Sequence, residues 1–181
     1  MQRNLSFKIV VTDDDNDNKL ITELGLPYDS VSNIVSNLAD SSELNEFYLT
    51  AAMHPAPNVR ESVAWKDKIS EDTFKILAED DSTLVLRSLS RSEAFKKYAD
   101  DQLVRKLIEL DSDCAQNIAG NLEALEQVDF DEIMNLLINA RDPSIRYSVA
   151  SNYSTPKRIL KILINDRDLQ VSQEAKKRLE N

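Results

Sequence analysis

The side chains that most often carry catalysis are scarce in this chain. It has one histidine, His54, and one cysteine, Cys114. A histidine-based catalytic site needs the imidazole beside a nucleophile and a carboxylate, and the neighbouring Pro55 indicates a loop. A Cys114–His54 pair is one alternative, and a small buried thiol is the other. We expect the buried thiol, because Cys114 falls where a helical repeat of this chain has Val59 and Ile145.

Cofactor-binding motifs are also missing. Phosphate-binding loops and dinucleotide fingerprints need closely spaced glycines for their tight turns, whereas Gly25 and Gly120 are the only glycines. One cysteine excludes an intramolecular disulfide framework and a cysteine-rich metal site. We therefore expect no cofactor, no metal and no small-molecule ligand.

An acidic run near the N-terminus has one feature of a calcium loop. Asp13, Asp15 and Asp17 have the alternate spacing of calcium ligands. However, Asn18 stands where the loop needs glycine, and Leu24 where it needs a bidentate glutamate. We expect a solvated acidic loop, with calcium binding as the weaker alternative.

Adjacent carboxylates could in principle act as an acid–base pair. They lie at expected helix starts and turns, where capping and the helix dipole account for acidic residues without catalysis. We therefore expect a protein that is not an enzyme. The pairs are Asp80-Asp81, Asp100-Asp101 and Asp131-Glu132.

The elements that position these residues are predicted by an internal repeat. Residues 56–64 and 142–150 share proline, an aliphatic residue, arginine, serine and Val-Ala in the same register. Such self-similarity is typical of stacked helical hairpins, which cannot bury their apolar faces alone. Repeat starts at 56, 81, 111 and 142 are unevenly spaced, so an irregular stack is expected.

Capping residues predict where several helices begin. We expect N-caps at Asp29 or Ser30, Ser70, Asp129 and Asp142. Thr155 is expected to cap a further helix with Pro156 at its first position, and the last helix to start near Asp168. The predicted core positions are Val59, Val63, Leu77, Cys114, Ile145, Val149, Ile159, Leu160 and Leu163.

The stretch Asp142 to Asp166 carries a recognisable pattern, Asp-Pro-x-Ile-Arg-x-x-Val-Ala-x-Asn-x-x-Thr-Pro-x-x-Ile-Leu-x-x-Leu-x-x-Asp. It resembles the leucine-rich repeat variant family, a HEAT-like α-solenoid, and residues 56–80 match less closely. The resemblance implies helix pairs and no single activity. One member of that family carries an iron–sulfur module in a cysteine cluster, which Cys114 alone does not reproduce.

The predicted fold is all-α, an irregular HEAT-like helical-hairpin solenoid with a short N-terminal strand or small β element. Leu5, Phe7 and Ile9 alternate with polar residues and predict that strand. Residues 1–28 then form the strand and acidic loop, and residues 29–181 form one compact repeat domain.

Arg60 and Arg146 occupy matching repeat positions. We favour a ladder in which each guanidinium binds an aspartate near a neighbouring turn. Contact with an external anion is the alternative.

Charge narrows the choice of partner. The net charge is −10, with 13 Lys and Arg against 27 Asp and Glu in residues 1–140, and 9 against 5 in residues 141–181. An acidic body repels phosphate backbones, which disfavours nucleic-acid binding and the alternative of a HEAT-like DNA repair enzyme.

Apolar runs are too short to span a membrane, and a cytoplasmic protein is expected.

The second helix of each pair, starting near residues 70, 99, 129 and 155, is expected to line an acidic groove for partner binding. The groove should become basic at Lys157 and Lys161. We expect a basic protein partner and, most specifically, a bacterial immunity protein that neutralises a basic, nuclease-type toxin. A scaffold or assembly adaptor is the alternative. The candidate partner-binding residues are Asp72, Glu79, Asp101, Glu109, Asp131 and Glu132.

Overall fold

The computed structural model describes residues 6–13 and 19–180. The chain is mostly helical, with 66% of it in helices, which confirms the predicted predominance of helices. The packing of the backbone separates two compact units, Met1–Ser92 (unit 1) and Glu93–Asn181 (unit 2). Each unit is described by itself, and the expected single repeat domain over residues 29–181 stays a prediction.

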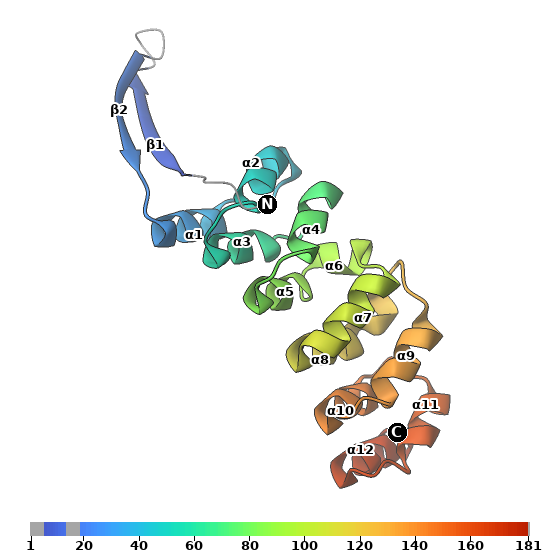
Figure 1. Ribbon diagram of the computed structural model, residues 1–181. Helices are drawn as coiled ribbons and strands as arrows, with labels where there is room; N and C mark the ends of the chain where they lie inside the picture. Colours follow the sequence, from blue (N-terminus) through green and yellow to red (C-terminus); the bar gives the residue numbers. More distant parts are fainter. Residues whose placement is uncertain (1–5, 14–18, 181) are drawn as a thin grey trace. The chain divides into compact units, whose positions relative to one another are not determined.

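Unit 1 begins with a β-hairpin of two antiparallel strands, β1 (Lys8–Asp13) and β2 (Lys19–Gly25) (Figure 1). The sequence predicted one strand in this region, and the structure has a second strand, β2, that was not predicted. The sheet is confined to residues before 28, as expected. The expected acidic loop, including the possible calcium ligands Asp15 and Asp17, lies outside the described residues.

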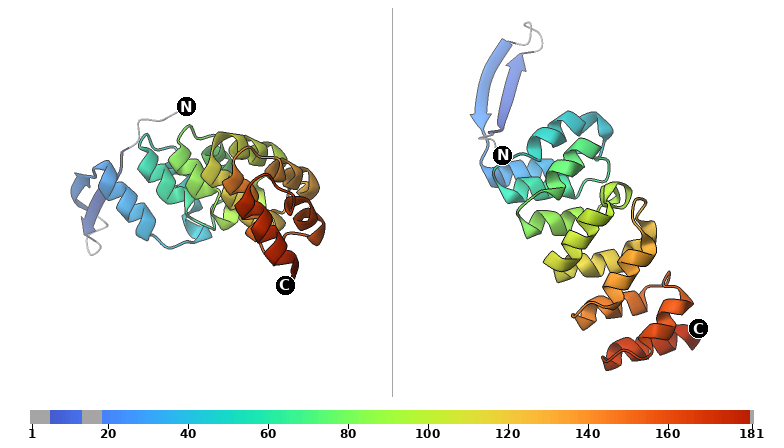
Figure 2. Two further views of the ribbon diagram at one scale, coloured as in Figure 1. Left: turned by 90° about the horizontal axis from the view of Figure 1, so that it is seen from below. Right: turned by 45° about the vertical axis from the view of Figure 1, so that its right-hand side comes forward.

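The helices of unit 1 form two layers. Helix α3 packs between α1 and α5, while α2 and α4 pack on each other and on this row (Figure 2). A short 3₁₀ turn, Ser42–Leu44, leads into α2. The helices are α1 (Tyr28–Asn37), α2 (Asn45–Ala51), α3 (Pro57–Ala64), α4 (Glu71–Ala78) and α5 (Thr83–Leu89).

Unit 2 repeats this arrangement. Helix α10 packs between α8 and α12, and α9 contacts α7, α8 and α10. Helix α11 packs on α10 and α12. The six-residue helix α6 was not predicted, because its two buried side chains, Ala94 and Phe95, are too few to show a helical period. The helices are α6 (Glu93–Tyr98), α7 (Asp101–Leu110), α8 (Ser112–Asn121), α9 (Phe130–Ile138), α10 (Pro143–Ser151), α11 (Lys157–Leu163) and α12 (Leu169–Glu180), with a 3₁₀ turn at Leu122–Ala124.

Three of the predicted N-caps are confirmed by side-chain hydrogen bonds. The Ser70 hydroxyl accepts from the backbone N–H of Thr73, and the Asp129 and Asp142 carboxylates cap α9 and α10 in the same way. These bonds satisfy N–H groups that have no partner inside the helix. The caps fix where each of these helices begins.

Two predicted caps are wrong, and proline is involved in both. Helix α1 begins at Tyr28 after Pro27, whose carbonyl accepts from the Val31 N–H, so Asp29 and Ser30 lie inside the first turn. Pro156 is the N-cap of α11 rather than its first residue. The Thr155 hydroxyl instead donates to the carbonyl of Val149 at 2.6 Å and closes the turn between α10 and α11.

The predicted core is confirmed. All nine predicted positions, Val59, Val63, Leu77, Cys114, Ile145, Val149, Ile159, Leu160 and Leu163, are buried. Helical spacing placed them correctly because each helix has one apolar stripe facing its neighbours.

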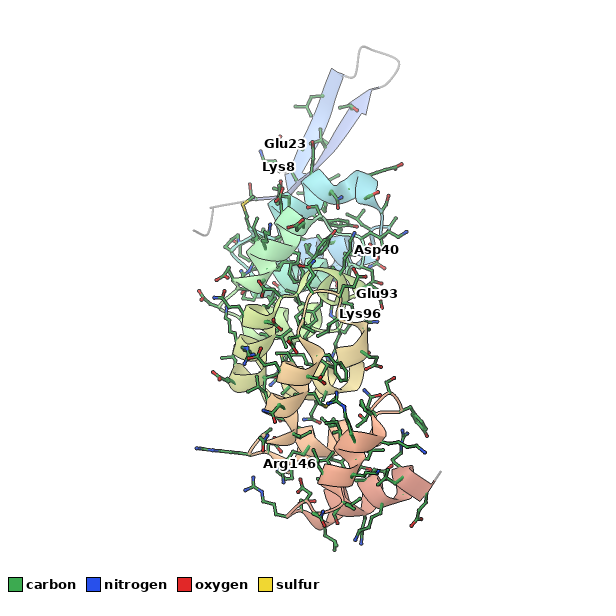
Figure 3. All side chains as sticks on the ribbon, turned by 90° about the vertical axis from the view of Figure 1, so that its right-hand side faces the viewer. Lys8, Glu23, Asp40, Glu93, Lys96 and Arg146 are labelled. Atoms are coloured by element: carbon green, nitrogen blue, oxygen red, sulfur yellow. The ribbon has the colours of Figure 1, made fainter. Side chains whose placement is uncertain are left out.

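The two arginines of the repeat bind aspartates in the same way in both units. Arg60 Nε and Nη2 donate to Asp80 at 2.6 and 2.9 Å, and its Nη1 donates to the carbonyl of His54 at 2.8 Å. Arg146 (Figure 3) donates to Asp166 at 2.7 and 2.9 Å and to the carbonyl of Ala140. Each pair joins residues 20 apart. The predicted arginine–aspartate contact is therefore confirmed.

Candidate functional site

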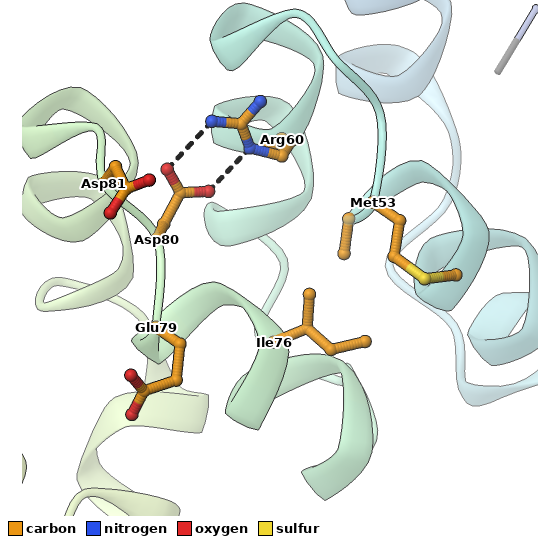
Figure 4. A pocket seen from close by; sticks show the side chains of 7 residues that line it. Met53, Arg60, Ile76, Glu79, Asp80 and Asp81 are labelled. Atoms are coloured by element: carbon orange, nitrogen blue, oxygen red, sulfur yellow. Dashed lines mark hydrogen bonds and ion pairs between the residues drawn. The ribbon is translucent and has the colours of Figure 1, made fainter. Parts of the chain in front are cut away.

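Unit 1 contains a pocket of about 220 Å³ beside the Arg60–Asp80 pair. The acidic residues Glu79, Asp80 and Asp81 follow one another along the turn that leaves α4, and Met53 and Ile76 lie on the other side (Figure 4). The pocket therefore combines an apolar wall with an acidic wall.

Within the acidic wall, the side chain of Asp80 is buried and forms an ion pair with Arg60. The side chain of Arg60 is only 7% exposed and that of Asp80 only 4%. Hydrogen bonding to Asp80 raises the pKa of Arg60, and this effect outweighs the opposing effect of burial. Arg60 also donates to the carbonyls of His54 and Pro55. Because four of its five N–H donors bond inside the protein and its side chain is buried, Arg60 is not placed to bind an external anion.

Glu79 and Asp81 form the accessible part of that wall. Both residues are exposed, whereas Met53 and Ile76 are half-buried. A lysine or arginine side chain has an aliphatic stem and a charged end. Such a side chain could place its stem against Met53 and Ile76 and its charge at Glu79 and Asp81.

The six predicted partner-binding acids are divided between the units. In unit 1, Asp72 is exposed on α4 and Glu79 caps its C-terminal end, two turns further along. In unit 2, Asp101 and Glu109 lie on α7, and Asp131 and Glu132 lie on α9. A groove running through both units stays a prediction, and so does its basic end at Lys157 and Lys161.

Cations from neighbouring helices meet the acids of α9. Asp131 forms an ion pair with Arg158 near the start of α11, and Glu132 forms one with Arg105 of α7. Asp101 accepts a hydrogen bond from the backbone N–H of Asp129 at 2.9 Å. Three of the six predicted acids therefore already have contacts within unit 2. Arg158 follows Asp131 by 27 residues, about one repeat, which is the sequence signal that could have revealed this pair.

His54 lies in an aromatic cluster that anchors the base of the hairpin. Its ring centroid is 5.7 Å from that of Phe7 and 4.9 Å from that of Tyr28, and Phe7 also contacts Phe47. Its Nδ1 accepts from the backbone N–H of Ala56 at 3.1 Å. Burial lowers the pKa of His54, which keeps the ring neutral near pH 7.

Burial supports the expected buried thiol over the alternative of a Cys114–His54 dyad. His54 is fully buried in unit 1 and Cys114 fully buried in unit 2. A nucleophile and its base must reach a substrate, and neither side chain is exposed to solvent.

Residues 6–13 and 19–180 contain neither a cluster of metal ligands nor a membrane-spanning helix. No group of three or more His, Cys, Asp or Glu side chains in this part of the chain could hold a metal ion. None of its helices has the length and apolar character needed to cross a membrane. Compared with known proteins, the chain matches no family model, no curated protein and no solved structure.

Proposed function

We propose that this protein is a non-catalytic binding protein that engages a cationic protein through its acidic surface. The observation that carries the proposal is the pocket in unit 1, where the exposed carboxylates of Glu79 and Asp81 stand beside the apolar side chains of Met53 and Ile76. This combination suits a lysine or arginine side chain of a partner.

The buried ion pair of Arg60 and Asp80 beside the pocket supports this proposal. Since Asp80 is bound by Arg60 through both carboxylate oxygens, its charge is compensated. Glu79 and Asp81 place two further carboxylates at the exposed edge of the pocket, so no charge of this wall is both buried and unpaired. The Arg60–Asp80 pair ties the turn after α4 to α3, and a turn held in this way needs less ordering on binding, which reduces the entropic cost of association.

The overall charge supports a partner of opposite sign. A net charge of −10 accelerates the approach of a basic protein by long-range attraction. Nuclease toxins carry cationic surfaces for phosphate groups, and carboxylates can occupy those surfaces in place of the nucleic acid. The most specific form of the proposal is an immunity protein that neutralises a basic, nuclease-type toxin.

The experiment starts from the genes beside this one. A neighbouring gene for a basic nuclease domain supplies the probe, and its association with the full chain is measured at several salt concentrations. The variant Glu79→Lys/Asp81→Lys should slow association and flatten its salt dependence, because it reverses the local field. The matched control is Glu43→Lys/Glu46→Lys, which changes the net charge equally at exposed acids outside the pocket.

The outcomes separate the alternatives. Equal slowing by both double variants would mean that only the total charge matters and that the pocket is not the site. Unchanged association in the pocket variant would also exclude it. A nuclease assay then distinguishes an immunity protein, which blocks cleavage, from a scaffold or adaptor, which binds and leaves cleavage intact.

A further inference from the structure

The outer edge of β1 pairs with no other strand among the described residues, since the sheet consists of β1 and β2 alone. The N–H of Leu26 donates to the carbonyl of Phe7 at 2.8 Å. In an antiparallel ladder, residue pairs alternate between hydrogen-bonded and non-hydrogen-bonded. Ile9, opposite Leu24, is therefore bonded to β2, while the N–H and C=O groups of Lys8 and Val10 point outward.

The two edges of the hairpin differ in regularity. Val11 lies opposite Thr22 and Thr12 opposite Leu20, so Ile21 is an extra residue in β2. Such a bulge bends the strand and interrupts its edge. The edge of β1 has no extra residue and is the more regular template for another strand.

Apolar side chains of the hairpin are open to solvent. Ile9 is 46% exposed, Val10 55% and Leu24 64%. A two-stranded hairpin is marginally stable in water, and additional strands stabilise it by completing the ladder and covering apolar surface. Within the described residues, this hairpin therefore has both an unpaired edge and apolar side chains that an added strand would partly cover.

The sequence of β1 fits a second copy of itself. When two β1 strands pair antiparallel about a two-fold axis at Val10, Val10 faces Val10 of the other copy and Lys8 faces Thr12. No like charges lie opposite each other in this register. Asp13, the last residue of β1, falls at opposite ends of the joined sheet in the two copies, so these two acidic residues do not lie opposite each other.

We propose that this protein forms a homodimer through β1, whose outer edge pairs with β1 of a second copy to make a four-stranded antiparallel sheet. The inference is independent of the proposed function, because it uses the hairpin and not the acidic pocket. Lys8 and Glu23 of the same hairpin already pair at 2.7 Å (Figure 3), so the charge of Lys8 is balanced before the copies meet.

The experiment uses the special position of Val10 on the symmetry axis. Sedimentation equilibrium of the full chain should show a reversible dimer. Val10→Lys alone and Val10→Glu alone should each be monomeric, because two like charges would face each other. An equimolar mixture of the two variants should restore a dimer containing one chain of each, which mass spectrometry of the intact complex identifies.

The matched control is Leu20, which is also 55% exposed but lies on β2. Leu20→Lys and Leu20→Glu should each remain dimeric without mixing. A wild-type chain that stays monomeric up to about 1 mM overturns the proposal, and so does a dimer that survives Val10→Lys alone. Failure of the mixture to restore the dimer would overturn the two-fold register.

Discussion

Asp166 binds Arg146 through both of its carboxylate oxygens, with Nε 2.7 Å from Oδ2 and Nη2 2.9 Å from Oδ1. Oδ1 also accepts from the backbone N–H of Asp168 at 2.8 Å. The side chain of Arg146 is 4% exposed and that of Asp166 is 7% exposed. The pair thus fixes the turn after α11 to the body of α10, away from solvent.

Breaking this pair should be costly. Asp166→Asn leaves the Arg146 cation buried without its counter-ion, and we expect a loss of about 3–5 kcal/mol in the free energy of unfolding. Asp131→Asn is the control, because the Asp131–Arg158 pair is about two-thirds exposed and should contribute below about 1 kcal/mol. Urea unfolding of both variants measures the difference, and equal effects would show that burial does not set the strength of the pair.

Acid should remove the contribution of Asp166. Its hydrogen bonds with Arg146 lower the pKa of this carboxyl in the folded state. The contribution is complete above the unfolded pKa of about 3.9 and is lost as the pH falls through the lower folded pKa. The stability difference between the wild type and Asp166→Asn should therefore shrink below about pH 4. A difference that stays constant well below about pH 4 would contradict the assignment.

His54 should give a second pH dependence in a separate window. Burial lowers its pKa in the folded state, so the unfolded chain takes up the proton first. Stability is full above the unfolded pKa of about 6.5 and should fall as the pH drops below it. His54→Asn can still accept from the Ala56 N–H and should remove this dependence between about pH 7 and 5. Since His54 is the only histidine, a dependence that persists in the variant would come from another group.

Leu160 tests the predicted core face of α11. Leu160→Ala should leave a cavity and cost about 2–5 kcal/mol, because Leu160 is 1% exposed. Ile162, on the same helix, is 55% exposed, and Ile162→Ala should change the free energy of unfolding by less than about 0.5 kcal/mol. Chemical denaturation of the two variants compares them directly, and a reversed order would mean that the helix faces the other way.

The chain contains natural probes for its expected single repeat domain. Trp65, the only tryptophan, lies in unit 1, and Cys114, the only cysteine, lies in unit 2. If residues 29–181 unfold as one domain, tryptophan fluorescence and thiol labelling should give the same midpoint in urea. Two separate midpoints would show that the units unfold independently.

Periodicity predicted much of the helical framework, because apolar spacing and capping residues are local signals. The predicted N-caps of α4, α9 and α10 are the observed ones, Ser70, Asp129 and Asp142. The start of α11 was misplaced because the Thr155 hydroxyl bonds backward to Val149. That choice depends on the turn as a whole and is not visible in residue type.

The candidate site was less predictable. Glu79 was expected at a binding surface, and it lines the pocket in unit 1. Met53 and Ile76 were not foreseen, because the apolar wall forms only when α4 packs beside the end of α2. The ion pairs of Asp131 and Glu132 also depend on packing between hairpins, so counting acids along one helix overstated the uncompensated charge of α9.

The hydrogen bonds between neighbouring hairpins also bear on how each unit folds. Glu61 and Ser88 are 27 residues apart, Asp101 and Asp129 are 28 apart, and Ser112 and Asp142 are 30 apart. These three bonds join helix pairs that are neighbours along the chain within one unit, and each closes a loop of about one repeat. Low contact order favours fast folding, and a unit held by contacts between neighbouring helix pairs has only short loops to close as it folds.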